Sequence, residues 1–341
     1  MVYMNKGELR SVAELLIPAV AYGDAAGLPV ETLSFEEIRQ RYGRIGRLLP
    51  SQENPFYESE SNPGAWSDDT QLTIVIARSL TRVGAFNLSD IADLHVDTYN
   101  DTPKLMRNGQ MIARGWGKST AKSVERYMQG VPAETTGEAH GAGNGVLMKM
   151  SPLALWHVAR DVNESVAYAE CDMLTSFTHN NPIAKIATRV HHDSLQYLMT
   201  QEYIQEEFIH TIQASAANHE RVFGCTNNDA SDSLRYLGEY RYLTTDRILQ
   251  STDGRGFYAP QTLAMAYGTF LAHDGEFAPS VYEAVNLGGD TDSNASIVAT
   301  MALMRSRGQF AKPNDFERVT RYDELAELSH RFAIRALVEA S

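Results

Sequence analysis

The sequence predicts an all-α protein, and three observations support this prediction. Apolar residues recur at steps of three and four positions, the spacing that places them on one face of a helix. Period-two alternation, which would indicate half-buried strands, is scarce. Glycine and proline punctuate the chain at regular intervals. The segments predicted to be helical are 12–21, 72–80, 146–158, 166–177, 183–198, 263–270, 281–287, 297–304 and 325–337.

The breaks between these helices have signatures of their own. Residues 23–31 (GDAAGLPVE) should end the first helix, because Gly caps helix C-termini and Pro stops their continuation. The same turn could instead deliver Glu31 to a cleft as a general base or substrate anchor. Residues 43–66 are polar, with Pro and Gly, which predicts a long surface loop of the kind that is often functional. Residues 178–182 (THNNP) should begin a helix, with an Asn cap and Pro in the first turn.

A glycine-rich stretch, residues 141–145 (GAGNG), precedes the helical segment 146–158. Such a loop at a helix N-terminus can bind phosphate through backbone N–H groups, although an ordinary flexible loop is an equal alternative. The dinucleotide fingerprint needs a strand before the glycines, and the polar residues 131–140 do not form one. A Rossmann unit is therefore excluded.

The chain has 341 residues, a formal net charge of −13 and two cysteines, Cys171 and Cys225. This charge argues against a surface that binds nucleic acid or an anionic membrane. The two cysteines make neither a disulfide framework nor a zinc motif, and they fit a reducing cytosol. There is no apolar signal core, and no uninterrupted apolar run has the ~18 residues of a spanning helix. We therefore expect a cytoplasmic protein.

Two short acidic runs carry the strongest functional signal: residues 67–70 (SDDT) and 288–293 (GGDTDS). Each concentrates carboxylate and hydroxyl oxygens just before an apolar helical segment. Oxygen ligands without cysteine or a nearby histidine suit Mg²⁺ or Mn²⁺. Brought together, the runs could hold two ions about 3.5–4 Å apart, as in two-metal hydrolytic sites. This requires residues 1–341 to form a single domain, and the chain has neither an internal repeat nor a splitting linker.

Helix capping is the alternative explanation for either run alone, since Ser, Thr and Asp are good N-caps and acidic first turns complement the helix dipole. Capping needs one such residue, whereas each run carries several. The adjacent carboxylates of Asp68 and Asp69 repel unless a cation compensates. Gly288 and Gly289 also allow an unusual turn just before the second run.

The segments GDAAGLPVE, WSDDTQ, GAGNGVLMKMSP, THNNPIA and VNLGGDTDSNASIVA occur in this order along the chain. In this the chain resembles the ADP-ribosylglycohydrolase family, which includes dinitrogenase reductase-activating glycohydrolase and the ADP-ribosyl-acceptor hydrolases. The resemblance extends from about residue 13 to residue 300. It implies an all-α domain of orthogonally packed helices with a binuclear Mg²⁺ or Mn²⁺ centre.

The resemblance also implies roles for individual residues. It implies that Glu31 lies beside the scissile bond and that His179 lines the adenosine side of the cleft, although a lone His at a helix entry is more often structural. The diphosphate-holding loop would comprise Gly143, Asn144 and Gly145 through Met148. The metal ligands would be Ser67, Asp68, Asp69, Asp290, Asp292 and Ser293.

Two segments depart from the family pattern. The family's Met-Arg after the glycine loop is Met148-Lys149 here, which removes the bidentate fork of arginine. Residues 97–108, where the family carries a mobile loop over the acceptor, do not align clearly, and Asp97 and Asn100 are candidate contacts there.

The segment GRGFY (254–258) resembles a region where an aromatic ring of the family packs near the ligand. Phe257 or Tyr258 could do so here, or could belong to the core.

The implied reaction is metal-dependent hydrolysis of the glycosidic bond that links ADP-ribose to an acceptor, with an oxocarbenium-like transition state. Glu31, or a metal-binding carboxylate such as Asp68 or Asp292, would take the proton from water. Arginine, serine, a nucleobase and a small ADP-ribose ester all remain open as acceptors, with a protein side chain such as arginine preferred. The alternatives are an inactive ADP-ribose-binding or structural protein on the same fold and, less favoured, a two-metal phosphatase.

Overall fold

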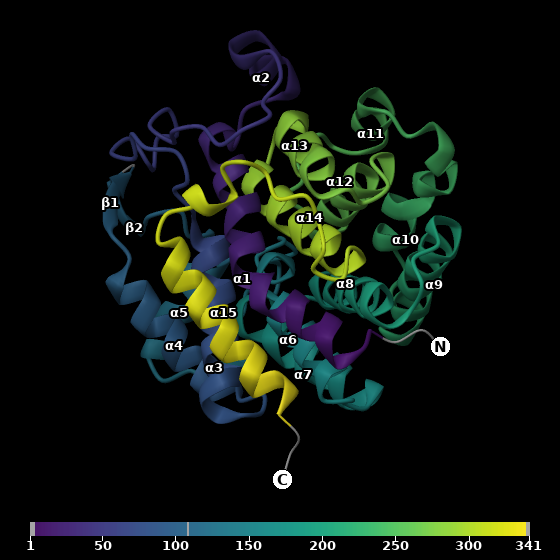
Figure 1. Cartoon of the computed structure of the whole chain (residues 1–341). Coiled ribbons are helices and arrows are strands. Elements are labelled where there is room, and N and C mark those ends of the chain that lie inside the picture. Colours follow the sequence, from purple (N-terminus) through teal and green to yellow (C-terminus); the bar gives the residue numbers. More distant parts are fainter. Residues whose placement is uncertain (1–3, 108, 339–341) are drawn as a thin grey trace.

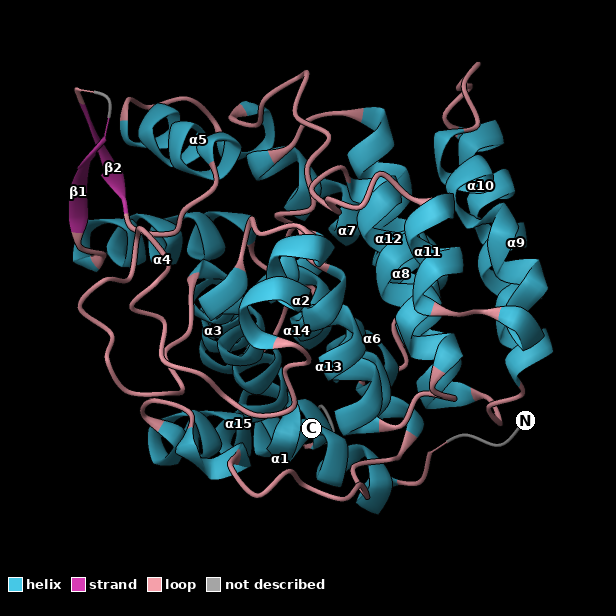
Figure 2. Cartoon of the chain, turned by 90° about the horizontal axis from the view of Figure 1, so that it is seen from above, coloured by secondary structure: helices cyan, strands magenta, loops and turns pink. Residues whose placement is uncertain are grey.

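Helices form in the segments that the apolar periodicity predicts, apart from the first residues of segment 146–158, and they account for most of the residues described by this computed structural model, 4–107 and 109–338 (Figures 1 and 2). The α-helices are α1 Lys6–Gly27, α2 Phe35–Tyr42, α3 Asp68–Val83, α4 Leu88–Asp101, α5 Lys118–Met128, α6 Ser151–Ala159, α7 Glu164–Thr178, α8 Pro182–Thr200, α9 Gln205–Val222, α10 Asp229–Leu234, α11 Thr245–Ser251, α12 Ala259–Ala272, α13 Phe277–Leu287, α14 Thr291–Arg305 and α15 Tyr322–Leu337. Shorter 3₁₀ turns are η1 Leu28–Val30, η2 Ala133–Thr135, η3 Leu147–Lys149, η4 Arg235–Tyr242 and η5 Phe316–Arg318.

The first helix packs against two of the last, since α1 contacts both α14 and α15 (Figure 1). The contact with α14 is backbone to backbone. A Cβ atom added at Gly27 would lie 2.3 Å from the carbonyl of Thr291, and one at Gly23 would lie 2.4 Å from the carbonyl oxygen of Ala295. Only glycine permits this approach, and it brings the C-terminal end of α1 to the start of α14.

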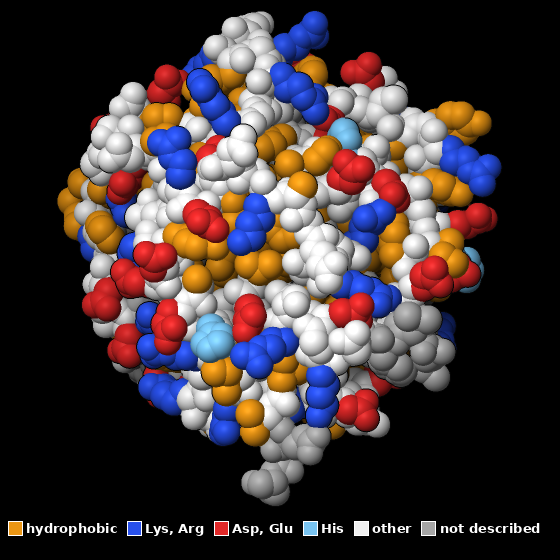
Figure 3. Space-filling model, viewed as in Figure 1, with side chains coloured by type: hydrophobic (Ala, Val, Ile, Leu, Met, Phe, Trp, Pro, Cys, Tyr) orange, Lys and Arg blue, Asp and Glu red, His pale blue; other side chains and the backbone are white. Residues whose placement is uncertain are grey.

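Helix α1 is also long and apolar enough, by length and composition alone, to cross a membrane. However, 83% of its apolar window is buried inside the protein. This burial is what a central core helix requires, because its side chains contact neighbouring helices on every side. On the face shown in Figure 3, acidic and basic side chains are interspersed.

The sequence pattern is wrong about the start of segment 146–158. Residues Leu147–Lys149 form the 3₁₀ turn η3, and α6 begins only at Ser151, with Pro152 in its first turn. Proline is tolerated there because the first N–H groups of a helix have no partner within it. The helix entry predicted at residues 178–182 is confirmed: the Asn181 side chain accepts from the N–H of Ile183.

Periodicity misses several shorter or more polar helices and a small antiparallel hairpin, β1 Lys104–Arg107 with β2 Gln110–Ala113. Strands of four residues are too short for an alternating pattern to stand out. The predicted loop at residues 43–66 lacks helix and regular strand, but it is not simply a surface loop. Tyr57 and Asn54 are buried in it, and they pack beside the end of α1.

Candidate active site

The two acidic runs meet, as the sequence predicts. One lies at the N-terminus of α3 and the other at the N-terminus of α14. The Ser293 hydroxyl donates to Asp69 Oδ2 at 3.3 Å, and the Ser296 hydroxyl donates to Asp69 Oδ1 at 3.0 Å. Ser293 and Asp69 are 224 residues apart in the chain. The packing of α1 against both α3 and α14 holds these two helix ends together.

A cavity of about 240 Å³ opens over the junction of the two runs. Most of the residues singled out by sequence lie in its wall: Glu31, Asp68, Asp69, Gly143, Asn144, Gly145, Met148, His179, Asp290, Asp292 and Ser293. Ser67 is buried just behind this wall, where its hydroxyl caps α3 by accepting from the N–H of Asp69 at 3.3 Å. Residues from widely separated helices thus converge on one small space.

The carboxylates of Glu31, Asp68, Asp69, Asp290 and Asp292, here called the acidic cluster, crowd one end of the cavity. Single oxygens of Glu31, Asp290 and Asp292 lie within 4.8 Å of one another. Glu31 is partly exposed, whereas the four aspartates are buried. Among the described residues, none of these carboxylates forms an ion pair with Lys or Arg.

Burial is the main cause of the raised pKa of every carboxyl in the acidic cluster. The charge of Asp292 is the next cause for Glu31, Asp68, Asp69 and Asp290, since like charges at close range disfavour a second ionisation. A divalent cation would remove this repulsion, and an all-oxygen donor set is the one that Mg²⁺ and Mn²⁺ prefer. The residues present therefore fit such ions.

Capping does not account for the second run. Asp290 occupies the N-cap position of α14 but makes no side-chain capping bond. Its Oδ2 accepts instead from the Asn144 side-chain amide at 2.6 Å, which ties the glycine-rich loop to the acidic cluster. Gly288 and Gly289 both have positive φ, of 82° and 79°, so the unusual turn predicted before this run is present.

Asp24 is a buried residue of the site that sequence reasoning assigned only to a turn. Its carboxylate accepts from the N–H groups of Ser67 at 2.9 Å and Thr70 at 3.0 Å, and from the Thr70 hydroxyl at 2.6 Å. It thereby fixes the start of α3. Burial and the charge of Asp292 raise the pKa of Asp24 to about 7. A carboxylate inside the otherwise apolar run 19–27 was the signal in the sequence.

Glu31 follows η1 and is held from two sides. The Asn54 side-chain amide donates to Glu31 Oε2 at 3.2 Å and to the carbonyl of Leu28 at 2.8 Å. The next residue, Thr32, has a φ of 72°, and its N–H donates to the carbonyl of Gly289 at 2.8 Å. The long loop and the second acidic run together therefore fix the position of this carboxylate.

The glycine-rich loop forms another part of the cavity wall, next to Asp290. The N–H of Asn144 donates to the carbonyl of Phe257 at 3.2 Å, which brings the Phe257 segment to the cavity. A Cβ atom at Gly145 would lie 2.9 Å from the His179 ring, so glycine is needed for this ring to pack there. Burial lowers the pKa of His179 to about 3, and the imidazole is therefore neutral.

Three of the proposed contacts lie elsewhere. Asp97 and Asn100 are exposed on α4 and do not line the cavity, because the period of that helix turns His95 and Tyr99 inward instead. The Tyr258 hydroxyl donates to Asp229 Oδ2 at 3.0 Å, and it is the neighbouring Phe257 that lines the cavity. Asn108, the end of the unaligned stretch 97–108, lies outside the described residues.

Sequence reasoning also missed the part of the rim formed by the first residues of α5 and the loop before them. Gly115, Gly117, Lys118, Ser119 and Thr120 line the cavity, and no side chain caps this helix end. A short polar loop carries little signal in a single sequence.

Lys149, which stands where the family has arginine, is buried rather than cavity-lining. Its ammonium lies 3.3 Å from His95 Nε2, and burial lowers the pKa of Lys149 to about 7.

Comparison with known proteins finds a matching family profile and several distantly related proteins. A family profile described as ADP-ribosylglycohydrolase matches residues 13–332. An uncharacterised protein of Archaeoglobus fulgidus is 28% identical over 87% of this chain and 87% of its own. The ADP-ribosyl-[dinitrogen reductase] glycohydrolase of Rhodospirillum rubrum is 26% identical over 49% of this chain and 51% of its own. The ADP-ribosylarginine hydrolase Tri1 of Serratia proteamaculans is 24% identical over 83% of this chain and 68% of its own.

A solved structure, described as an ADP-ribosylglycohydrolase-related protein complex, has a TM-score of 0.71 and 24% identity to this chain. The superposition covers 97% of this chain and 99% of the other. This likeness shows a shared all-α fold.

Proposed function

Since the chain belongs to the ADP-ribosylglycohydrolase family, we propose that it hydrolyses the glycosidic bond between ADP-ribose and the guanidinium of a modified arginine side chain. Family membership supports an ADP-ribosyl hydrolase. The observation that carries the proposal for this chain is the convergence of both acidic runs and Glu31 on one cavity. The names of the relatives from Serratia and Rhodospirillum, an ADP-ribosylarginine hydrolase and a dinitrogen reductase glycohydrolase, support arginine as the acceptor.

The proposed cofactors are two Mg²⁺ or Mn²⁺ ions. The residues that would hold them are Asp68, Asp69, Asp290, Asp292 and Ser293, which line the cavity, and Ser67, whose hydroxyl lies just behind the wall at 3.3 Å from Asp69 Oδ2. When bound, these ions would supply Lewis acidity and orient the ribose hydroxyls. They would also cancel the repulsion among the buried carboxylates.

Glu31 is the proposed general base. It is the partly exposed member of the acidic cluster, and Asn54 holds one of its oxygens, so its other oxygen is left to accept a proton from water. The water oxygen forms a bond to the anomeric carbon as the bond from that carbon to the guanidinium nitrogen breaks. The nitrogen takes up a proton, and the products are ADP-ribose and unmodified arginine.

The remaining wall of the cavity suits the rest of ADP-ribose. The first N–H groups of α5 have no partner within their helix, and Lys118, Ser119 and Thr120 at that helix start line the cavity. Together with the glycine-rich loop, this end of the cavity presents donors to a diphosphate. The neutral His179 and the Phe257 segment lie beside the same loop, as a ring-binding surface for the nucleoside.

The test is release of ADP-ribose from defined substrates. The protein, with Mg²⁺ or Mn²⁺, is incubated with peptides ADP-ribosylated on arginine or serine, and free ADP-ribose is measured by mass spectrometry. We expect release from the arginine-linked peptide, and none after EDTA treatment. Tight binding of ADP-ribose without hydrolysis of any substrate would instead establish an inactive binding protein on this fold. Hydrolysis of only the serine-linked peptide would overturn the arginine assignment alone.

A further inference from the structure

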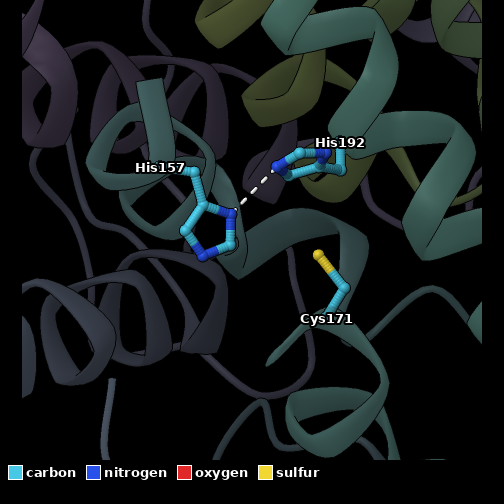
Figure 4. A group of neighbouring side chains, drawn as sticks. All are labelled: His157, Cys171 and His192. Carbon is cyan, nitrogen blue, oxygen red and sulfur yellow. Dashed lines mark hydrogen bonds between the residues drawn. The ribbon is translucent and has the colours of Figure 1, made fainter. Parts of the chain in front are cut away.

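A second group of metal-ligand side chains lies away from the acidic cluster, between α6, α7 and α8 (Figure 4). It consists of His157, Cys171 and His192, here called the His–Cys cluster. One ring nitrogen of each histidine and the cysteine sulfur lie within 4.8 Å of one another. The three side chains are 3%, 0% and 1% exposed. In Figure 4 the sulfur points toward the two rings from below.

Carboxylates stand behind both histidines. Glu170 Oε2 lies 2.8 Å from His157 Nε2, so that nitrogen carries the proton and donates. Asp193 Oδ1 faces His192 Nδ1 at 3.5 Å. The hydroxyls of Ser215 and Tyr168 donate to Asp193 at 2.6 and 3.0 Å, which marks it as an acceptor. Metal-binding histidines characteristically donate their outer N–H to a carboxylate in this way.

The ring nitrogens that do not face these carboxylates face each other. His157 Nδ1, whose ring proton is on Nε2, and His192 Nε2 lie 3.0 Å apart. When His192 carries its proton on Nε2, this contact is an ordinary hydrogen bond; when Asp193 holds that proton on Nδ1, two lone pairs face each other and a cation between them removes their repulsion. The hydrogen bond alone gives no role to the sulfur beside the two rings. A metal ion uses all three ligands.

We propose that His157, Cys171 and His192 form a binding site for a transition-metal ion of the zinc class, separate from the acidic cluster. Imidazole and thiolate ligands select zinc-like ions over Mg²⁺. Two imidazole nitrogens at about 2.0–2.1 Å from a tetrahedral zinc ion stand roughly 3.3 Å apart, close to the separation in this protein. Three protein ligands leave one position for a small ligand such as water.

The site has a mechanical consequence for the cavity. Helices α6 and α7 each pack against α8, and a bound ion would join all three. The turn between α7 and α8 carries His179, which lines the cavity. The ion would therefore brace the helices that hold this wall in place. The proposal does not depend on ADP-ribose hydrolysis.

The test uses Co²⁺ as a spectroscopic probe on the full-length protein. After chelator treatment and dialysis, one equivalent of Co²⁺ is added in the presence of excess Mg²⁺, which occupies oxygen sites. We expect tetrahedral d–d bands and a thiolate-to-cobalt charge-transfer band, both displaced by one equivalent of Zn²⁺. Oxygen ligands alone cannot give the charge-transfer band, so binding at the acidic cluster is distinguished.

The two cysteines offer a matched pair of variants. Cys171→Ser should lose the charge-transfer band, whereas Cys225→Ser, which alters the other cysteine, should keep it. Glu170→Gln should weaken Zn²⁺ affinity roughly 10- to 100-fold. If Cys171→Ser fails to fold, His192→Gln replaces it and should lose the band. A folded wild-type protein with no thiolate band, or a band that persists in Cys171→Ser, would overturn the proposal.

Discussion

The acidic cluster and the His–Cys cluster differ in how their charges are compensated and in whether they adjoin a cavity. The acidic cluster gathers like charges around a cavity, and none of these carboxylates forms an ion pair with Lys or Arg among the described residues. The His–Cys cluster is closed, and carboxylates stand behind both of its rings. Uncompensated charge beside an opening favours binding of a cation and leaves room for a substrate. The closed cluster has no room for a substrate, and it suits an ion that stays in place.

The largest expected effect is that of a change at Asp290, which should alter the acidic cluster and leave the His–Cys cluster intact. Asp290→Asn should reduce Mn²⁺ affinity and ADP-ribose release at least ~100-fold, because it removes a carboxylate from the junction of both runs. It should leave the cobalt–thiolate band of the His–Cys cluster unchanged. Calorimetry with Mn²⁺, the release assay and the cobalt spectrum measure these quantities. Asp323→Asn, an exposed change on α15, is the control and should behave as wild type.

Glu31→Gln tests whether this carboxylate of the acidic cluster acts in catalysis or in stability. Turnover should fall by about 10²–10⁴, the usual contribution of a general base, while the melting temperature changes by only a few degrees. A turn-exit carboxylate that is partly exposed adds little to the core. Glu36→Gln, an exposed neighbour on α2, is the matched control. Retained activity together with a large loss of stability would assign Glu31 a structural role instead.

The pH dependence of stability should differ with and without divalent ions. Asp24 has a folded-state pKa of about 7, above its usual value of 3.8, so the native state binds its proton more tightly than the unfolded state. Its contribution is therefore complete below about pH 4 and is lost as pH rises through 7, by at most about 4 kcal/mol. In chelator, urea unfolding should show this loss, and saturating Mg²⁺ should reduce it. A pH-independent free energy of unfolding in chelator would contradict the prediction.

The smallest expected effect lies outside both clusters. Asp97→Asn and Asn100→Ala should change ADP-ribose release by less than about twofold, because both side chains are exposed on α4 and do not line the cavity. Lys118→Ala, a change at the cavity rim, is the comparison variant and should raise KM for ADP-ribosylated substrates. A strong effect of Asp97→Asn would mean that α4 contacts the acceptor.

The two clusters also differ in how far the sequence reveals them. The carboxylates of the two acidic runs stand in short contiguous stretches, 67–70 and 288–293, so both runs could be singled out from the sequence, and the resemblance to a family implied that they share one site. The His–Cys ligands come singly from three helices, and no spacing motif links them. Their convergence depends on how α6 and α7 pack on α8, which apolar periodicity does not encode. The long helices were predictable because their buried faces repeat, whereas Asn54 lies in a loop and Lys118 at a helix start, and tertiary contacts bring both to the site.

The close contact of α1 with α14 has a consequence for protein synthesis. Helix α1 emerges from the ribosome early, but the backbone against which Gly23 and Gly27 pack belongs to residues that begin at Thr291. At about 5–20 residues per second, the apolar surface of α1 stays without this partner for roughly 15–50 s. During that interval the surface of α1 that packs on α14 stays uncovered, and the site between α3 and α14 cannot form. We expect α1 to be the segment of the nascent chain that a ribosome-associated chaperone covers.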